Sequence, residues 1–441
     1  MMSKKVYIET YGCQMNVADS EVVVSILAGK GYEHTENIND AGLILINTCS
    51  IRDNAEQRIW GRLKAISHLK KKKSGLLVGL IGCMAERLKE QVIEKERLVD
   101  IVVGPDAYRD LPSLIVDAES GHKGVNVLLS REETYADISP VRMDKNGVTS
   151  FVSIMRGCNN MCAYCVVPYV RGAERSRDPE SILSETRDLW EMGYREVTLL
   201  GQNVDSYNWE NNGSQIRFHD LLEKVALINP LLRVRFSTSH PKDISDELLL
   251  TMSKYDNICK HIHLPAQSGS SRILKLMNRE YTREWYMDRI KAIRTIIPGC
   301  AVSTDMIAGY CTETDDDHNE TLSLMEWAGY DFAYMFKYSE RPGTKAARKY
   351  NDDVVEEVKT RRLNEIIALQ NKLSARSKKQ DVGRVFEVLI ESLSKRSADH
   401  LAGRTTHNKV VVFPGNGHRK GEYVKVLIER NTSATLIGKI I

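Results

Sequence analysis

The pattern of apolar and polar positions in the first third of the chain alternates between strand-like and helix-like segments. Two of the apolar runs are almost continuous, which is typical of parallel strands buried on both faces. The predicted strands are Val6–Thr10, Leu43–Asn47, Leu76–Ile81 and Ile101–Val103. After Asp53, apolar residues recur at helical spacing from Ala55 to Leu69. This βαβ pattern predicts an N-terminal open parallel α/β domain over residues 1–145.

The middle of the chain repeats a strand-then-helix pattern six times. The strand-like segments begin near Phe151, Glu196, Arg233, His261, Ala301 and Phe332. One helix has clear end signals, because Asp178 can cap it, Pro179 suits its first turn and Gly193 suits its exit. We expect a partial (β/α)6 barrel over residues 146–375, with function on the loops that follow the strands.

The last region, residues 376–441, has alternating apolar positions punctuated by glycine, which predicts a small antiparallel β-barrel. It holds 13 basic and 6 acidic residues, a net charge of +7, so the rest of the chain carries −4 of the total +3. A basic barrel of this kind favours RNA or DNA contact, and a solvated basic surface is the alternative.

The composition narrows the class of protein. The 441 residues have room for two to four domains. With 42% apolar and 27% charged residues, disordered and collagen-like classes are excluded. Neither a signal peptide nor a run of about 18 apolar residues is visible, so we expect no membrane helix. A reducing, cytoplasmic location then follows, in which cysteines are more often ligands than crosslinks.

Three of the nine cysteines, Cys158, Cys162 and Cys165, have the spacing CxxxCxxC directly after a predicted strand. Structural zinc is the alternative, but it needs four ligands, and no fourth Cys or His stands at finger or ribbon spacing. Three thiolates on one loop suit three irons of a 4Fe–4S cluster and leave the fourth iron open. This stretch resembles the cluster loop of radical S-adenosylmethionine (SAM) enzymes.

Three further cysteines, Cys13, Cys49 and Cys83, each follow a predicted strand of the N-terminal domain. Ligands bind at the carboxyl ends of strands in open α/β sheets, so these thiols are expected to converge on a second cluster. The alternative is three isolated buried cysteines. The remaining cysteines show no such placement and are interpreted as structural: Cys259, Cys300 and Cys311.

At this point the chain resembles, over nearly its whole length, the methylthiotransferase family of radical SAM enzymes. The resembling stretches are Tyr11–Asn16, Asn47–Arg52, Met155–Cys158, Val167–Gly172, Gly201–Val204, Ser239–Pro241 and His263–Gly269. The resemblance implies an N-terminal three-cysteine domain, a radical SAM partial barrel and a C-terminal TRAM β-barrel that binds RNA. It also implies that Cys13, Cys49, Cys83, Cys158, Cys162 and Cys165 are the metal ligands and act in catalysis.

The resemblance implies methylthiolation of carbon 2 of N6-isopentenyl-adenosine at tRNA position 37. It implies two [4Fe-4S] clusters and two SAM molecules, of which one methylates sulfur and the other generates a radical that removes hydrogen from the base. The implied partners are the tRNA anticodon stem-loop, with the target base flipped out, and a reducing electron-donor protein; a monomer is expected. Alternatives are a sister methylthiotransferase acting on threonylcarbamoyl-adenosine or ribosomal protein, and a non-catalytic RNA-binding protein with structural zinc.

Candidate contacts to SAM lie in the cluster loop and at the ends of the predicted barrel strands. They are Tyr164, Gly201, Gln202, Asn203, Ser239 and Gln267. The loop Gly309–Thr314 departs from the family's GFPGET pattern, so no SAM contact is carried over to it. The candidate RNA contacts are basic residues after the cluster loop and in the terminal barrel. They are Arg171, Arg175, Arg177, Arg404 and Lys409. Those after the cluster loop could meet the SAM carboxylate in place of tRNA phosphate, and a solvated surface is the other alternative.

Overall fold

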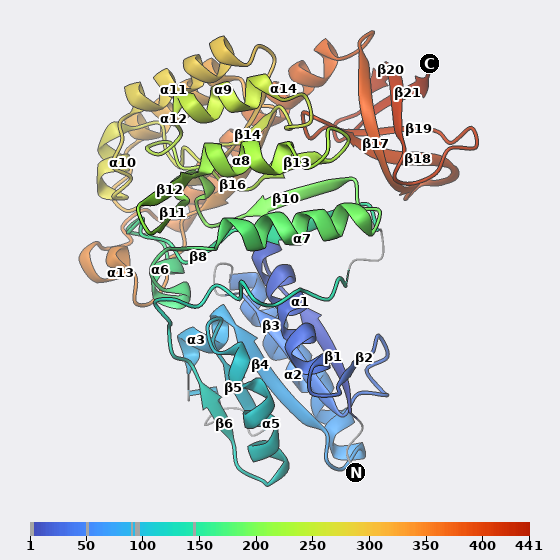
Figure 1. The fold of residues 1–441 in the computed structure, drawn as a ribbon. Helices are drawn as coiled ribbons and strands as arrows, with labels where there is room; N and C mark the ends of the chain where they lie inside the picture. Colours follow the sequence, from blue (N-terminus) through green and yellow to red (C-terminus); the bar gives the residue numbers. More distant parts are fainter. Residues whose placement is uncertain (1–3, 50–52, 90, 93–97, 144–146) are drawn as a thin grey trace. The chain divides into compact units, whose positions relative to one another are not determined.

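The structure is a computed structural model that describes residues 4–49, 53–89, 91–92, 98–143 and 147–441 (Figure 1). Motif residues 50–52 and the predicted boundary at 145 lie outside the described residues. The chain divides into two compact units. The first unit comprises residues 1–143, 155–159 and 165–181, and the second comprises 144–154, 160–164 and 182–441.

The first unit is built on a six-stranded, all-parallel sheet with the order β2-β1-β3-β4-β5-β6. Its strands are β1 (Lys5–Thr10), β2 (Glu33–His34), β3 (Leu43–Thr48), β4 (Leu77–Gly82), β5 (Ile101–Val103) and β6 (Gly124–Asn126). All four predicted strands are present. The predicted open parallel α/β domain is therefore confirmed for this part of the chain.

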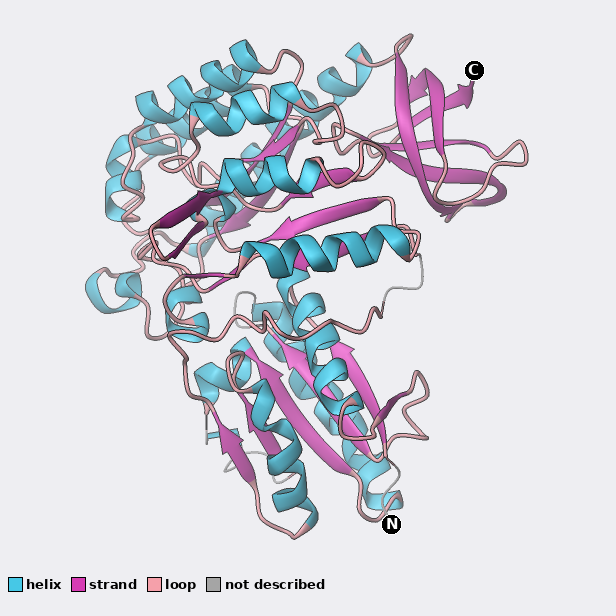
Figure 2. Cartoon of the chain, in the orientation of Figure 1, coloured by secondary structure: helices cyan, strands magenta, loops and turns pink. Residues whose placement is uncertain are grey.

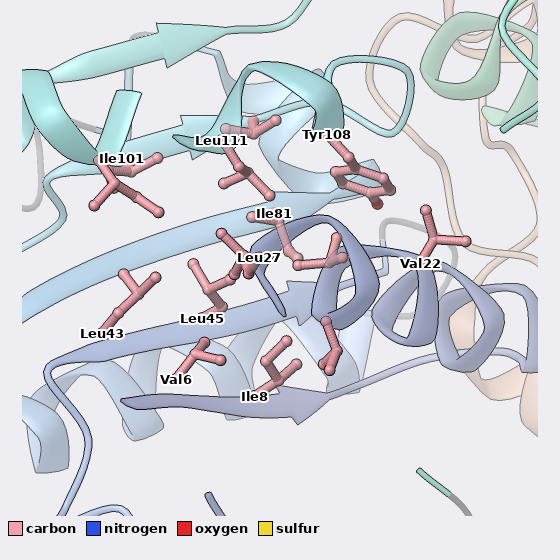
Figure 3. Packing of buried hydrophobic residues seen from close by; sticks show 14 of the residues in the cluster. Val6, Ile8, Val22, Leu27, Leu43, Leu45, Ile81, Ile101, Tyr108 and Leu111 are labelled. Atoms are coloured by element: carbon pink, nitrogen blue, oxygen red, sulfur yellow. The ribbon is translucent and has the colours of Figure 1, made fainter. Parts of the chain in front are cut away.

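Helices cover both faces of this sheet (Figure 2). They are α1 (Gln14–Ala28), α2 (Asp53–Lys72), α3 (Cys83–Leu88), the 3-10 turn η1 (Tyr108–Asp110) and α5 (Leu111–Glu119). Successive residues of β3 point to opposite faces, so Leu43 and Leu45 belong to the core on the side of α1 (Figure 3), whereas Ile44 and Ile46 join the core under α2. Two apolar cores hold the sheet rigid, which fixes the positions of its carboxyl ends.

The same unit also contains a segment that lies far along the sequence. Its elements are β8 (Met155–Arg156), α6 (Val167–Arg171) and β9 (Arg175–Ser176). Strands β8 and β9 pair antiparallel, and α6 packs against α3. The residues flanking the CxxxCxxC loop therefore belong to the N-terminal unit.

The second unit contains six parallel barrel strands, as the sequence predicts. They are β7 (Thr149–Ser153), β10 (Glu196–Leu200), β13 (Arg233–Phe236), β14 (His261–His263), β15 (Ala301–Ala308) and β16 (Phe332–Lys337). They pair in two groups, β13-β10-β7 and β14-β15-β16, and a parallel bridge between Thr238 and His263 connects the groups. A 3-10 turn and a hairpin follow β10: η2 (Val204–Ser206), β11 (Asn208–Asn211) and β12 (Ser214–Arg217).

Helices follow the barrel strands along the chain. They are α7 (Pro179–Glu191), α8 (Phe218–Ala226), α9 (Asp246–Lys254), α10 (Ser271–Leu276), α11 (Arg283–Ile296), α12 (Asp315–Ala328), α13 (Lys345–Lys349) and α14 (Glu356–Gln380). The predicted end signals of α7 are present, because Asp178 Oδ2 accepts a hydrogen bond from the Ser181 backbone N–H over 2.8 Å and Gly193 has φ +99°. Among the described residues, no helix is long and apolar enough to cross a membrane.

The C-terminal strands close into a barrel with the order β17-β18-β19-β21-β20. They are β17 (Val385–Ser394), β18 (Ser397–Thr405), β19 (Val410–Pro414), β20 (Tyr423–Asn431) and β21 (Leu436–Ile440). This confirms the predicted small barrel; the predicted boundary at residue 376 falls inside α14. The barrel is tied to the strand starts of the same unit: Arg233 Nη1 donates to the Arg404 carbonyl over 2.8 Å, and Arg235 Nη2 donates to that of Thr405 over 2.7 Å.

Candidate functional site: two cysteine sets and their surroundings

The first site lies at the carboxyl edge of the parallel sheet in the first unit. Cys13 follows β1, Cys49 follows β3, and Cys83 follows β4 as the first residue of α3. These strands are direct neighbours in the sheet, so the three thiols stand at one edge. A Cβ added at Gly12 would lie 2.6 Å from Cys49 Cβ, and Gly12 has φ +128°. The glycine lets the first cysteine loop pass directly against the second.

Two buried asparagines brace the loops that carry these thiols. The Cys13 thiol donates to Asn16 Oδ1 over 3.2 Å, and Asn16 Nδ2 donates to Asn47 Oδ1 and to the Thr48 carbonyl over 2.9 and 3.0 Å. Asn47 Nδ2 in turn donates to the Asn16 carbonyl over 2.8 Å. The network joins the start of α1 to the end of β3, 31 positions away in sequence, and so holds the Cys13 and Cys49 loops against each other.

None of the three cysteines is in a disulfide; Cys49 and Cys83 are buried and Cys13 is partly exposed. Burial raises the pKa of the Cys83 thiol to about 12. The Arg171 guanidinium acts on Cys83 in the opposite direction, whereas Cys49 and Cys13 raise its pKa further. Mutual electrostatic influence of this kind requires that the three sulfurs lie close together.

The donor set fits an iron–sulfur cluster. Among the described residues, no group of three or more His, Cys, Asp or Glu side chains surrounds a single metal-ion position. An iron–sulfur cluster has a different requirement, because each thiolate binds a different iron atom. Three thiols on neighbouring strand ends meet that requirement.

Two of the predicted RNA contacts are buried in this unit instead of lying on a surface. Arg171 Nη2 donates to Asp19 Oδ2 over 2.9 Å, and Arg175 Nη2 donates to Asp106 Oδ1 over 2.8 Å. A third guanidinium, that of Arg156, donates to Asp19 Oδ1 over 2.8 Å. Burial raises the pKa of the Asp19 carboxyl, but Arg156 and Arg171 more than offset this and lower it overall. This ion-pair network joins the cluster-loop flanks to the N-terminal sheet domain.

The third predicted arginine after the cluster loop, Arg177, is also buried. Its Nε donates to the hydroxyl of Ser181 in the first turn of α7 over 2.9 Å. Its role as an RNA contact stays a prediction. Burial of all three guanidiniums favours positions inside the protein over direct contact with a phosphate backbone.

The cysteines of the CxxxCxxC loop are divided between the two units. Cys158 and Cys165 belong to the first unit, where the Cys158 N–H donates to the Gly172 carbonyl over 3.2 Å. A Cβ at Gly157 would lie 2.0 Å from the Ala173 carbonyl oxygen, so only glycine fits before Cys158. The Val167 N–H donates to Cys165 Sγ over 3.4 Å. The grouping of Cys158, Cys162 and Cys165 therefore rests on their spacing in sequence.

Cys162 belongs to the second unit, where it meets an arginine that the sequence analysis did not single out. Arg279 Nη1 donates to Cys162 Sγ over 3.3 Å, and Arg279 Nη2 donates to the Pro265 carbonyl over 2.9 Å. Burial would lower the pKa of Arg279, but Tyr281, Tyr164 and Cys162 raise it well above its usual value. No sequence signal links Cys162 with Arg279, which lies 117 positions further along the chain.

Two of the predicted SAM contacts are engaged in a buried polar cluster. It lies after the second and third barrel strands. Ser239 donates through its hydroxyl to Asp205 Oδ1 over 3.0 Å, and Asn203 Nδ2 donates to Asp243 Oδ2 over 2.7 Å. Asp205 and Asp243 were not among the sequence candidates, although Asp205 follows the Gly201–Val204 motif directly. The structure brings Asn203 and Ser239 together through these two carboxylates.

This polar cluster has hydrogen-bonding capacity left over. Asn203 Oδ1, Asp205 Oδ2 and His240 Nε2 are buried and have no hydrogen-bond partner within the described chain. Burial raises the pKa of Asp205 to about 8 and lowers that of His240 to about 2, with Arg279 and Lys242 lowering the latter further. Buried polar atoms are rarely left unpaired, so these three fit a bound ligand that carries donors and acceptors, as SAM does.

Two other predicted SAM contacts, Gly201 and Gln267, form hydrogen bonds through their backbone groups. Gly201 accepts from and donates to the hydroxyl of Ser237 over 3.1 Å in each case. Gln267 has φ +68°, and its backbone pairs with Asp305 and Ile307 of β15 over 2.9 Å. Gln202 and Tyr164 are partly exposed. Their contact with SAM stays a prediction.

The loop Gly309–Thr314 is held by its own glutamate. Glu313 Oε2 accepts from the Gly309 N–H over 2.6 Å and from Arg362 Nη1 over 2.9 Å. Burial raises the pKa of Glu313 to about 7. Thr314 then caps α12 through a reciprocal pair of hydrogen bonds with Asp317.

The three remaining cysteines are buried: Cys259, Cys300 and Cys311. Burial raises the pKa of Cys259 to about 11 and that of Cys300 to about 12, and it also raises that of Cys311. Neutral buried thiols behave as small apolar groups, in agreement with the structural interpretation.

The two predicted RNA contacts of the C-terminal barrel differ in exposure. The Arg404 side chain is 42% exposed, and its Nη1 donates to Asn408 Oδ1 over 2.8 Å. The Lys409 side chain is only 15% exposed, and its Nζ donates to Asp381 Oδ2 over 2.7 Å and to the hydroxyl of Ser377 over 2.9 Å. Lys409 therefore fastens the barrel to the end of α14, whereas the Arg404 side chain is open to solvent.

Comparison with known proteins agrees with this architecture. Residues 5–104 match the family described as Uncharacterized protein family UPF0004, residues 152–325 match the Radical SAM superfamily and residues 379–441 match the TRAM domain. Among solved structures, the radical SAM methyltransferase TsrM from Kitasatospora setae has a similar fold, with a TM-score of 0.59 and 13% identity over 78% of this chain and 75% of that one. At that identity the likeness concerns the fold alone.

Curated relatives are far closer in sequence. A protein from Parabacteroides distasonis is 59% identical over 99% of this chain and 95% of its own length, and one from Amoebophilus asiaticus is 57% identical over 100% and 93%. Both are named tRNA-2-methylthio-N(6)-dimethylallyladenosine synthase. The sister branches and the zinc-structured alternative are not favoured. The chain belongs to the radical SAM methylthiotransferase family, in the branch that includes these synthases.

Proposed function

We propose that this chain is the enzyme that adds a methylthio group to carbon 2 of N6-isopentenyl-adenosine at position 37 of tRNA. The observation that carries the proposal is the meeting of Cys13, Cys49 and Cys83 on neighbouring strand ends in a chain that also has the CxxxCxxC loop. A radical SAM enzyme that only abstracts hydrogen needs one cluster, whereas insertion of sulfur calls for a second site that handles sulfur.

Two sets of ligands follow from this proposal. Cys158, Cys162 and Cys165 would hold one [4Fe-4S] cluster with SAM at its open iron, and the three N-terminal cysteines would hold the auxiliary cluster. When bound, the first cluster supplies the electron that cleaves SAM, and the second supplies the site at which sulfur is methylated. The protein contributes position: Gly12, Asn16 and Asn47 fix the thiols of the auxiliary site.

Residues around the barrel strand ends orient SAM. We expect SAM to bind through three buried atoms that have no hydrogen-bond partner within the described chain: Asn203 Oδ1, Asp205 Oδ2 and His240 Nε2. Because its pKa is raised to about 8, Asp205 holds a proton at neutral pH, so it donates a hydrogen bond and adds no negative charge. His240 remains neutral, since its pKa is lowered to about 2. A neutral polar lining of this kind suits the hydroxyl and amide-like edges of an adenosyl group.

Two features of the second unit support an RNA substrate. Phe332 and Tyr334 of β16 stand on one face of the strand, each 49% exposed, and Tyr334 contacts the His263 ring edge-to-face with ring centroids 5.8 Å apart. Unpaired bases stack on exposed aromatic rings. The basic C-terminal barrel offers Arg404 to the phosphate backbone. We expect an adenine that is flipped out of the loop to stack on these aromatic rings, and the rest of the anticodon stem-loop to bind the basic barrel.

Three further expectations belong to this proposal. The reduction of the clusters requires an electron-donor protein, the enzyme acts as a monomer, and it works in the reducing cytoplasm. Of the residues predicted to contact RNA, Arg404 is the one that we expect to contact phosphate, because Arg171, Arg175 and Arg177 are buried.

Nucleoside mass spectrometry of tRNA tests the reaction. A strain that lacks this gene should lose the 2-methylthio-isopentenyl nucleoside, and the gene should restore it. Restoration of a different methylthio nucleoside would contradict the substrate.

Anaerobic reconstitution tests the cofactors. We expect about eight irons per full-length chain and about four after Cys13, Cys49 and Cys83 are all replaced by Ala. Replacement of Cys259, Cys300 and Cys311 by Ala is the matched control and should leave the iron content at about eight. Bound zinc without iron would rule out the catalytic interpretation.

A further inference from the structure

Arg171 occupies a specific place beside the three N-terminal cysteines. It is the last residue of α6, which packs against α3, the helix that begins at Cys83. Its Nη2 donates over 2.9 Å to Asp19 of α1, the helix that begins directly after Cys13. The guanidinium is therefore anchored on α1, and the helix that carries it packs against α3.

One end of this guanidinium has no partner. Arg171 is 2% exposed, and its Nη1 is buried with no hydrogen-bond partner within the described chain. A guanidinium has five N–H donors, and leaving charged donors unpaired costs more than the ~1–3 kcal/mol of a neutral group. A buried arginine keeps such an arrangement where something absent from the polypeptide completes it.

Electrostatics show which groups Arg171 faces. Burial lowers the pKa of Arg171, but Asp19, Cys83 and Cys13, in that order, raise it well above its usual value. Arg175, four residues later, is committed to Asp106 and has no cysteine among the main influences on its pKa.

We propose that Arg171 is a positioning residue of the auxiliary site, with Nη1 donating a hydrogen bond to sulfur at the Cys13, Cys49 and Cys83 cluster while Nη2 is anchored on Asp19. This inference rests on the proposed function and extends it to a residue outside the ligands. A fixed positive charge beside an anionic cluster stabilises its reduced, more negative state, and hydrogen bonds to the sulfurs act in the same direction. Arg171 therefore sets the reduction potential at which sulfur is handled.

The test uses the full-length chain with Cys158, Cys162 and Cys165 replaced by Ala, so that the auxiliary cluster is the only one. The cluster is reconstituted anaerobically, its iron is counted, and the reduced form is followed by electron paramagnetic resonance while dithionite and mediators set the potential. In this background, Arg171→Gln should lower the ratio of reduced to oxidised cluster at a fixed potential about tenfold, which corresponds to about 59 mV for one electron. Arg171→Lys keeps the charge and should recover most of the ratio.

Arg175→Gln is the matched control, because it removes a buried, ion-paired arginine of the same unit and should leave the potential unchanged. Where Arg171→Gln alone leaves Asp19 too poorly paired to fold, the Asp19→Asn and Arg171→Gln double variant removes both charges and should show a smaller fall in the same direction, because loss of the Asp19 anion offsets part of the loss of the cation. A folded, four-iron variant with an unchanged potential would overturn the role of Arg171. Absence of iron from the parent chain would instead overturn the cluster assignment, and this inference with it.

Discussion

Arg279 Nη1 donates a hydrogen bond to the sulfur of Cys162 over 3.3 Å, and both residues are buried. The same guanidinium reaches the Pro265 carbonyl through Nη2 and the Tyr281 hydroxyl through Nε, over 2.9 and 3.0 Å. One arginine thus ties the middle cysteine of the CxxxCxxC loop to the segment that follows β14. The pairing commits a buried cation to a cysteine of the cluster loop.

Replacement of Arg279 by Gln should weaken this connection. The shorter neutral side chain leaves the Pro265 carbonyl and Cys162 without their donor, so we expect the free energy of unfolding to fall by about 1–3 kcal/mol. Chemical denaturation of the apo protein measures it. Arg361→Gln is the control, because Arg361 is 48% exposed and its ion pairs lie in solvent; it should leave the free energy of unfolding almost unchanged. Equal losses in the two variants would contradict the structural role of Arg279.

Gly12→Ala should damage the auxiliary site. The added Cβ would lie 2.6 Å from Cys49 Cβ in a residue with φ +128°. Strain of this kind costs about 1–3 kcal/mol, and the displaced Cys49 should lower the iron bound per chain toward about four. The control is Gly75→Ala, where φ is +79° but nothing lies within 4 Å of the new Cβ; it should be strained yet keep its iron. Full iron content in Gly12→Ala would show that the cysteine loops need not pass so closely.

Asp205 should make stability depend on pH. Its pKa is about 3.8 in the unfolded chain and about 8 in the folded protein, chiefly through burial. Its contribution to stability is therefore fully present below pH 3.8 and is lost as pH rises through about 8. Between these values, the stability of the wild type relative to Asp205→Asn should fall by at most about 1.4 kcal/mol per pH unit. Urea denaturation without SAM at several pH values measures this difference, and a difference that is the same at every pH would contradict it.

Arg404 and Lys409 should respond differently to replacement by Ala. Arg404→Ala should weaken tRNA binding and reduce the slope of log affinity against log salt by nearly one, because one phosphate contact is lost. Lys409→Ala should instead lower the free energy of unfolding, because Asp381 is left buried without its ammonium partner. Fluorescence anisotropy over a salt series and chemical denaturation distinguish the two. If Lys409→Ala lowered the salt slope and left the free energy of unfolding unchanged, Lys409 would be an RNA contact and its structural role would be contradicted.

The periodic elements and the order of the domains were predictable from the sequence. Strands that are buried on both faces must be apolar throughout, as β3 and β4 are, and amphipathic helices must repeat at 3.6 residues, as α2 does. Cys13, Cys49 and Cys83 were also identifiable, because parallel strands place their carboxyl ends at one edge whatever the details of packing. The constraints on these strands, helices and cysteines are local or topological, so the spacing of residues in the sequence is enough to predict them.

The roles of the charged residues were decided only by the tertiary structure. Arg171, Arg175 and Lys409 look like phosphate contacts in the sequence, yet each is buried or nearly so and paired with a carboxylate. Asp19 and Arg171 are 152 residues apart, and Cys162 and Arg279 are 117 apart. A charged side chain has the same local appearance whether it faces water or a distant partner. The sequence alone therefore determined at which edge of the sheet the three thiols lie. The fold decided which cations lie beside the cysteines, because burial and ion pairing depend on segments that come together only after folding.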